Sequence, residues 1–169
     1  MVSINGVSLK KEKLVYVYGV DILTADVYLD GKKLGNWCED ADGGEDRFDF
    51  NEKLLKSAMD AYKNSLPDGY IYKKAMGFNV FLNEIHNLND LRKTLRKHWK
   101  ENPNTHIVVV SNGFSNGIIS YYDNCREEEL NTKIDEMRNE LKSEKNLGFD
   151  NLGCVIRHYD SEEDFVFNF

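Results

Sequence analysis

Residues 24–50, TADVYLDGKKLGNWCEDADGGEDRFDF, decide how the N-terminal part of the chain folds. Apolar and polar side chains alternate over residues 24–29, which predicts a strand with one buried face. The dipeptide Asp30-Gly31 then predicts a tight hairpin turn, because glycine adopts a positive φ without steric cost. Residues 32–38 form the returning strand, so the segment begins with an antiparallel hairpin.

Two earlier segments extend this hairpin into a meander. Residues 2–9 alternate apolar and polar side chains around Asn5-Gly6, which favours a strand. Residues 14–20, LVYVYGV, are rich in β-branched and aromatic side chains and also predict a strand. Gly19 interrupts this second strand and indicates a β-bulge. We therefore expect an antiparallel sheet at the N-terminus.

The rest of the chain mixes helices with strands. Apolar residues at helical spacing predict helices at about 52–65, 89–101 and 126–146. Apolar runs predict strands at 106–111, 118–122, 152–159 and 165–169. Segment 80–82 fits either a short strand or the start of a helix. Because strands and helices come in blocks, we expect a single α+β domain over residues 1–169, with one antiparallel sheet covered on one face by the helices.

The composition is that of a globular protein. A chain of 169 residues buries roughly two-thirds of its unfolded surface, so it needs no disulfide or metal to fold. Cys38, Cys125 and Cys154 are far apart and odd in number, which suits buried thiols in a reducing cytosol. No segment has the roughly 18 apolar residues of a membrane helix, and the N-terminus lacks a signal peptide. We therefore expect a cytoplasmic protein that does not enter the membrane.

The net charge of −7 is unevenly distributed. Residues 21–60 and 126–169 are acidic, whereas residues 61–100 carry 8 bases against 3 acids. A surface that is mostly acidic repels phosphate, so direct binding of nucleic acid is not expected. The same acidity favours a basic protein partner.

The acidic stretch around Gly43-Gly44 is the first candidate site. An EF-hand loop starting at Asp40 needs glycine at its sixth position and glutamate at its twelfth, where this chain has Glu45 and Asn51. We therefore predict no metal and no cofactor, although non-standard binding of Ca²⁺ or Mg²⁺ by clustered oxygens stays open. The stretch is either a solvated connection or a partner surface. The candidate partner-binding residues are Asp40, Asp42, Glu45, Asp46 and Asp49.

A basic stripe on the predicted helix 89–101 is the second candidate surface. Its residues recur at i, i+1, i+4 and i+5, so they lie on one side of the helix. Such a stripe can contact phosphate, but it is more often a solvated helix face. The residues are Arg92, Lys93, Arg96 and Lys97.

The sequence holds no motif that predicts catalysis. Residues 113–117 match G-x-S-x-G by letter, but that motif needs a strand followed by a helix, and here a strand is predicted after it. The four histidines show no HxH or HExxH spacing, although a zinc site built from distant residues stays open. No Walker loop and no GxGxxG motif is present.

The pattern of a strand, D-G-K-K-x-G, a second strand and an acidic Gly-Gly stretch resembles a loose group of small proteins encoded on bacterial phages and mobile elements. It stands here as VYLDGKKLGNWCEDADGGEDRFDF over residues 27–50. The later basic helix and the strand HIVVVS at 106–111 are compatible with that group. The resemblance supplies no catalytic residues. It implies an accessory protein that binds host defence or regulatory machinery, as anti-CRISPR proteins do.

Three functional hypotheses follow. The first is a non-catalytic intracellular binding protein, a phage-type inhibitor of a nucleic-acid-binding defence complex that acts through its acidic surface. The second is a small enzyme or a nucleotide- or metal-binding protein, with a site built on Asp40, Asp42, Glu45 and His106. The third is a structural or assembly protein, which predicts a large apolar patch and a stable oligomer.

Overall fold

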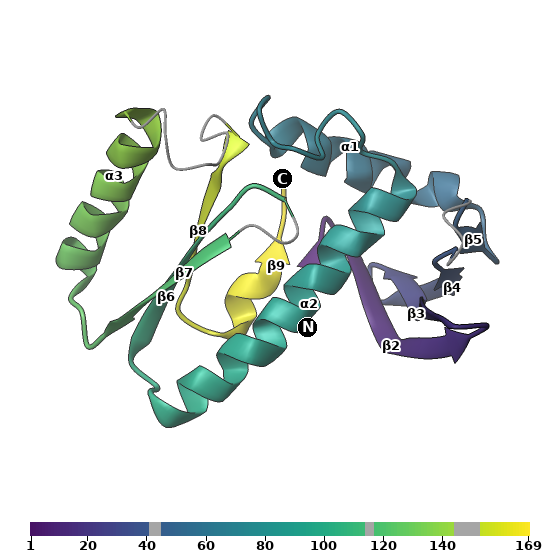
Figure 1. The fold of residues 1–169 in the computed structure, drawn as a ribbon, viewed down its shortest axis with the longest axis horizontal. Coiled ribbons are helices and arrows are strands. Elements are labelled where there is room, and N and C mark those ends of the chain that lie inside the picture. The colour runs from purple at the N-terminus through teal and green to yellow at the C-terminus, as the bar shows by residue number, and fades with distance from the viewer. Residues whose placement is uncertain (41–44, 114–116, 144–152) are drawn as a thin grey trace.

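The structure is a computed structural model that describes residues 1–40, 45–113, 117–143 and 153–169. Within these ranges the chain forms two β-sheets and three α-helices (Figure 1). The α+β fold class expected from the sequence is confirmed. No helix in these ranges is long and apolar enough to cross a membrane.

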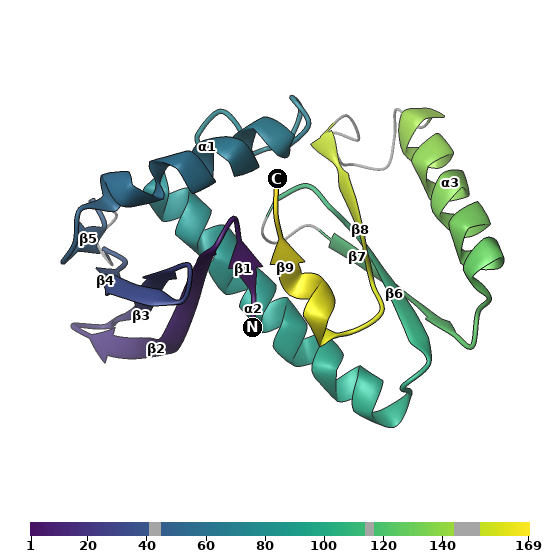
Figure 2. The same ribbon diagram turned by 180° about the vertical axis from the view of Figure 1, so that it is seen from behind.

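The first sheet contains the N-terminal meander and the C-terminal end of the chain. Its strand order is β5-β4-β3-β2-β1-β9, and β9 runs parallel to β1, while the other neighbours are antiparallel. Figure 2 shows β1 and β9 side by side near the two chain ends. The strands are β1 (Ser3–Ile4), β2 (Val7–Val17), β3 (Val20–Leu29), β4 (Lys32–Cys38), β5 (Arg47–Phe48) and β9 (Val166–Phe167).

Two-residue turns with positive φ connect this meander. Asp30 and Gly31 have φ of 49° and 79°, so the hairpin predicted between β3 and β4 is confirmed. Tyr18 and Gly19, with φ of 48° and 93°, form the same kind of turn between β2 and β3. The bulge predicted at Gly19 is therefore wrong. The irregularity in β2 lies between Lys10 and Lys13 instead.

The later strands form a sheet of their own. The second sheet has the order β7-β6-β8, with β6 (Thr105–Ser111) between β7 (Gly117–Asp123) and β8 (Val155–Tyr159). The prediction of one continuous sheet is therefore wrong. A short 3₁₀ helix, η3 (Glu162–Phe165), follows β8 and redirects the chain, so that the last strand β9 joins the first sheet.

The helices agree with the sequence except at one boundary. η1 (Glu52–Leu55) and α1 (Lys56–Ser65) together cover the first predicted helix. α2 (Phe78–Glu101) starts well before residue 89, because its buried apolar face continues back to Phe81. Segment 80–82 is therefore helical. α3 (Glu127–Ser143) matches the third predicted helix, whose expected end at about 146 lies outside the described residues.

Helix α2 packs into one core shared by both sheets. Its buried Phe81 and Leu95 belong to the same apolar cluster as Trp37 of β4 and Ile107 of β6. Figures 1 and 2 show α2 running diagonally between the sheets, with α3 beyond the second sheet. The smaller cluster of Val108, Leu130 and Ile134 joins α3 to the other face of that sheet. The second sheet is thus covered on both faces.

Candidate functional site

Two of the five predicted acidic residues accept hydrogen bonds from neighbouring segments of the fold. The indole Nε1 of Trp37, which is completely buried, donates to Asp46 Oδ2 at 2.7 Å. Asp49 accepts from the backbone N–H of Asn36, and also from its side-chain Nδ2 at 2.6 Å. These carboxylates therefore hold β4 against the segment that contains β5, and they are less free to meet a partner than the sequence suggested.

The remaining acids differ in exposure. Glu45 is exposed and Asp40 is half-buried, with its backbone N–H 3.4 Å from Asp46 Oδ1. Asp42 lies outside the described residues. The alternative site that joined these acids to His106 is not assembled by the described residues: His106 lies on β6 in the second sheet, whereas Asp40 and Glu45 lie beside β4 and β5 in the first.

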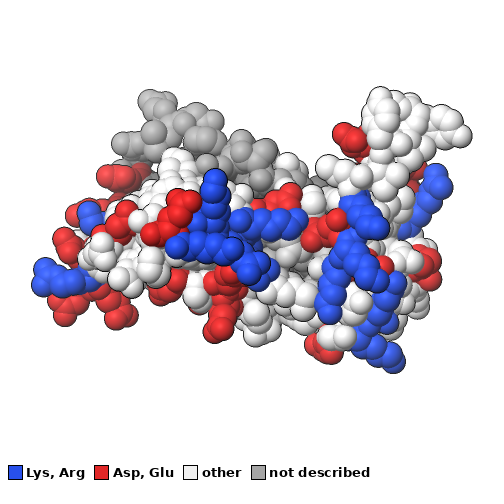
Figure 3. Space-filling model, turned by 90° about the horizontal axis from the view of Figure 1, so that it is seen from below, with Lys and Arg blue, Asp and Glu red and all other residues white. Residues whose placement is uncertain are grey.

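The basic stripe on α2 is largely engaged in ion pairs. Arg96 Nε lies 2.8 Å from Glu162 Oε1, and Arg92 pairs with the other oxygen of the same carboxylate. Lys93 Nζ lies 2.8 Å from Asp90 Oδ1. Figure 3 shows Lys and Arg interspersed with Asp and Glu on one face of the molecule. The two arginines join α2 to η3. The stripe is therefore partly a structural contact and not only a solvated helix face.

A pocket of about 230 Å³ lies between α2 and the second sheet. Leu88 and Leu91 of α2 line it together with Val109 of β6, and its polar lining includes Glu84 and Arg157. Both charged residues come from regular elements, α2 and β8, which fix their positions. The pocket therefore combines apolar walls with a carboxylate and a guanidinium, the composition typical of small-molecule sites.

A chain of hydrogen bonds connects the two charges through tyrosines. Tyr62 Oη donates to Glu84 Oε2 at 3.0 Å and accepts from Arg157 Nη2 at 3.3 Å. Tyr70 Oη donates to the other Glu84 oxygen at 2.7 Å. Arg157 Nη1 also donates to Ser111 Oγ at 3.4 Å. Each buried group in this chain thus has a partner, which offsets the cost of removing it from water.

Burial dominates the electrostatics of this network. It raises the pKa of Glu84 above its usual value, although the two tyrosine hydroxyls and Arg157 act in the opposite direction. Burial and the nearby Glu84 carboxylate also raise the pKa of Tyr70 and Tyr62. Burial lowers the pKa of Arg157, but the surrounding tyrosine hydroxyls and the Glu84 carboxylate outweigh this effect. The pKa of Arg157 is therefore raised, and its guanidinium stays charged. A buried acid with a raised pKa beside a fixed cation is a common feature of functional sites.

The outer part of the β2–β3 hairpin, residues 14–22, is a second distinctive feature and is called the β-arm below. Its apolar side chains are in solvent: Leu14 is 68% exposed, Tyr16 73% and Tyr18 103%. Val15 and Val20 are exposed as well. Because successive residues of a strand point to opposite faces, Val15 and Tyr16 show that both faces of the arm are uncovered.

Comparison with family models, with curated proteins and with solved structures finds no match for this chain. The assignment of a site therefore rests on the residues themselves.

Neither the pocket nor the exposure of the β-arm is evident from the sequence alone. Glu84 follows Phe81 by three residues and precedes Leu88 by four, so it is a charge on the apolar face of α2. A helix that starts at residue 89, as the sequence predicts, does not include Glu84. Residues 14–20 predict a strand, but their sequence does not indicate whether a second layer covers that strand.

Proposed function

We propose that this chain is a non-catalytic binding protein that contacts a protein partner through the β-arm. The observation that carries the proposal is the exposure of aliphatic and aromatic side chains on both faces of a projecting hairpin. Soluble proteins rarely leave contiguous apolar surface uncovered unless it takes part in an interaction. Tyrosine suits such contacts, because it buries a large area while losing few rotamers.

The finer proposal is that the partner is a basic, nucleic-acid-binding defence complex and that the chain inhibits it. The net charge of −7 and the resemblance of residues 27–50 to phage-encoded proteins support this proposal. Among the predicted acids that the structure describes, Glu45 is exposed and has no hydrogen bond that holds the fold. Acidic groups of this kind would speed association with a basic surface, and the β-arm would supply contacts that slow dissociation.

The test is a quantitative binding experiment with matched variants. The protein is immobilised and exposed to lysate of its native host, and each retained protein is then purified and titrated against it. The double variant Tyr16→Ser/Tyr18→Ser should weaken binding while leaving the melting temperature nearly unchanged, because both side chains are exposed. Tyr121→Ser, which removes a partly exposed tyrosine from β7, is the control and should bind as wild type.

Two outcomes would contradict the proposal. A partner that binds both variants equally would exclude the β-arm as its contact surface. A wild-type chain that is dimeric in light scattering, with the dimer lost in the arm variant, would favour the assembly hypothesis instead.

Low salt should increase the association rate if the partner is basic, since steering between exposed charges is screened beyond about 8–10 Å at physiological ionic strength.

The pocket supports a second candidate function, the binding of a small polar molecule. The specific observation is that Glu84 and Arg157 both line a cavity with apolar walls. Arg157 and Ser111 would bind a small anionic group such as a carboxylate or a phosphate. Thermal shift against a panel of small carboxylates and phosphates tests this function. A stabilising compound that loses its effect in Ser111→Leu, which narrows the pocket, would support it, and a panel without effect would count against it.

A further inference from the structure

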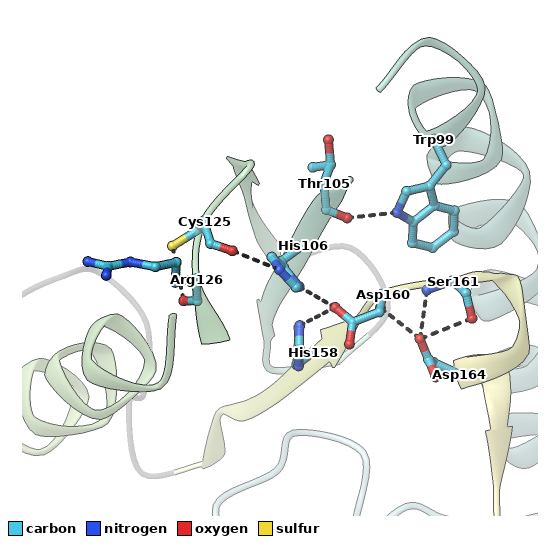
Figure 4. A network of polar contacts seen from close by, with 9 residues as sticks. All are labelled: Trp99, Thr105, His106, Cys125, Arg126, His158, Asp160, Ser161 and Asp164. Atoms are coloured by element: carbon cyan, nitrogen blue, oxygen red, sulfur yellow. Dashed lines mark hydrogen bonds and ion pairs between the residues drawn. The ribbon is translucent and has the colours of Figure 1, made fainter. Parts of the chain in front are cut away.

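Three side chains from two distant segments of the sequence meet at one end of the second sheet. His106 projects from β6, His158 from β8, and Asp160 follows directly after β8 (Figure 4). Each offers one ligand atom, and these atoms all lie within 4.8 Å of one another. His158 Nε2 is 2.7 Å from Asp160 Oδ1, and His106 Nδ1 contacts the same oxygen. Antiparallel pairing sets Val108 opposite His158 and thereby brings the two histidines together.

Each ring nitrogen of His106 faces an oxygen atom. Its Nε2 lies 3.1 Å from the carbonyl oxygen of Cys125, while its Nδ1 faces Asp160 Oδ1. A neutral imidazole carries one N–H, so it donates to only one of these two oxygens. If Nε2–H donates to Cys125, the lone pair of Nδ1 points at a carboxylate. A metal cation between Nδ1 and Asp160 would remove that repulsion.

The surroundings hold these groups in position. The Cys125 carbonyl lies where it would accept a hydrogen bond from Nε2–H of His106, and an outer contact of this kind is usual for a metal-binding histidine. Asp164 Oδ2 accepts from the backbone N–H of Asp160 and of Ser161, each at 2.7 Å, and the capping box of Ser161 and Asp164 starts η3. Figure 4 shows the connected network. Asp160 therefore comes from a turn whose backbone is fixed by its own hydrogen bonds.

We propose that His106, His158 and Asp160 bind a first-row divalent transition metal, with Zn²⁺ as the ion to test. Two imidazoles and a carboxylate suit Zn²⁺, whereas Ca²⁺ and Mg²⁺ take oxygen ligands only. Zinc–ligand distances of about 2.0–2.2 Å place ligand atoms roughly 3–3.5 Å apart, so small side-chain movements accommodate the ion. Three protein ligands leave a coordination position for water. This site differs from the acidic stretch for which the sequence predicted no metal.

The test is a titration of the purified chain with Zn²⁺ in competition with a chromophoric chelator. Wild type should bind one ion per chain at this site and melt at a higher temperature in its presence, because the metal binds the folded state. His158→Gln and Asp160→Asn should each weaken binding by at least about tenfold and lose the thermal shift. Their metal-free melting temperatures show whether the fold is kept, and the exposure of both side chains favours this.

His98→Gln is the matched control, since it removes a histidine that contacts Asp123 and Tyr121 outside the cluster. It should bind Zn²⁺ as wild type does. The Co²⁺ complex should lack a thiolate-to-metal charge-transfer band, because no cysteine sulfur belongs to the cluster. Absence of binding to wild type would overturn the proposal. Equal weakening in His98→Gln and His158→Gln, or a thiolate band, would also overturn it.

Discussion

Asp46 and Glu45 are neighbours in the chain, yet their carboxylates have different surroundings. Asp46 accepts a hydrogen bond from a buried indole, whereas Glu45 is in solvent. At the scale of single residues, the acidic stretch thus divides into groups that hold the fold and groups that remain available to a partner. The sequence shows only the charge of each residue.

Asp46→Ala should lower the free energy of unfolding by about 1–3 kcal/mol, since it leaves the buried Trp37 N–H without an acceptor. Glu45→Ala should change it by less than about 0.5 kcal/mol, as for most exposed positions. Chemical denaturation of the two variants measures the difference. Equal midpoints would show that the Trp37–Asp46 contact contributes nothing.

Glu84 should give the stability a specific pH dependence. Burial raises its pKa in the folded state above its usual value of 4.5, so the folded chain binds the proton more tightly than the unfolded chain does. The stability from this effect is fully present below about pH 4.5 and is lost as the pH rises through the folded pKa. Glu84→Gln should therefore gain stability relative to wild type as the pH increases.

Denaturation of wild type and Glu84→Gln across this pH range measures the difference in their unfolding free energies. The two proteins share all other titrating groups, so the contributions of those groups cancel in this difference. A difference that is independent of pH would mean that the pKa of Glu84 is not raised. Asp60→Asn, a partly exposed change on α1, is a control that should not show the same trend.

At the scale of elements, the helices are defined by the surfaces that they cover. Leu130 and Ile134 of α3 are buried against Val108 of β6, while Leu141 near the helix end is only half-buried. The apolar stripe that predicts this helix therefore differs in burial along its length. Repetition at helical spacing does not reveal where the covered surface ends.

Leu130→Ala and Ile134→Ala should each cost about 2–5 kcal/mol of unfolding free energy, because each leaves a cavity in a small cluster. Leu141→Ala should cost clearly less, since the removed atoms are partly in solvent. Urea denaturation of the three variants gives the order. A Leu141 variant as unstable as the Ile134 variant would place the end of α3 in a tighter contact than its exposure indicates.

At the scale of the whole molecule, the two chain ends complete one sheet. Ser3 pairs with Val166 and Ile4 with Phe167, and Phe165 stacks on Tyr159 at a centroid distance of 4.3 Å. The connection through η3 therefore links the two sheets around α2. The ion pairs of Glu162 with the two arginines of α2 reinforce the same junction.

Phe165→Ala should lower the free energy of unfolding by about 3–5 kcal/mol, since its side chain is completely buried in the shared core. Phe169→Ala, at a position 53% exposed, is the matched control and should cost much less. Hydrogen exchange of the β1 amides should rise in the Phe165 variant. Unchanged exchange would mean that β1 stays ordered without the C-terminal contact.

The sequence by itself determined the elements whose signals are local. Alternation and Asp30-Gly31 predicted the hairpin, and apolar spacing predicted α1 and α3, because these patterns follow from backbone geometry within a few residues. Only the tertiary structure decided which strands share a sheet, since edge pairing depends on how α2 and η3 direct the chain. It also decided that His106 lies beside His158 and Glu84 near Arg157, because such contacts join residues about 50 or more positions apart, a separation that no local pattern encodes.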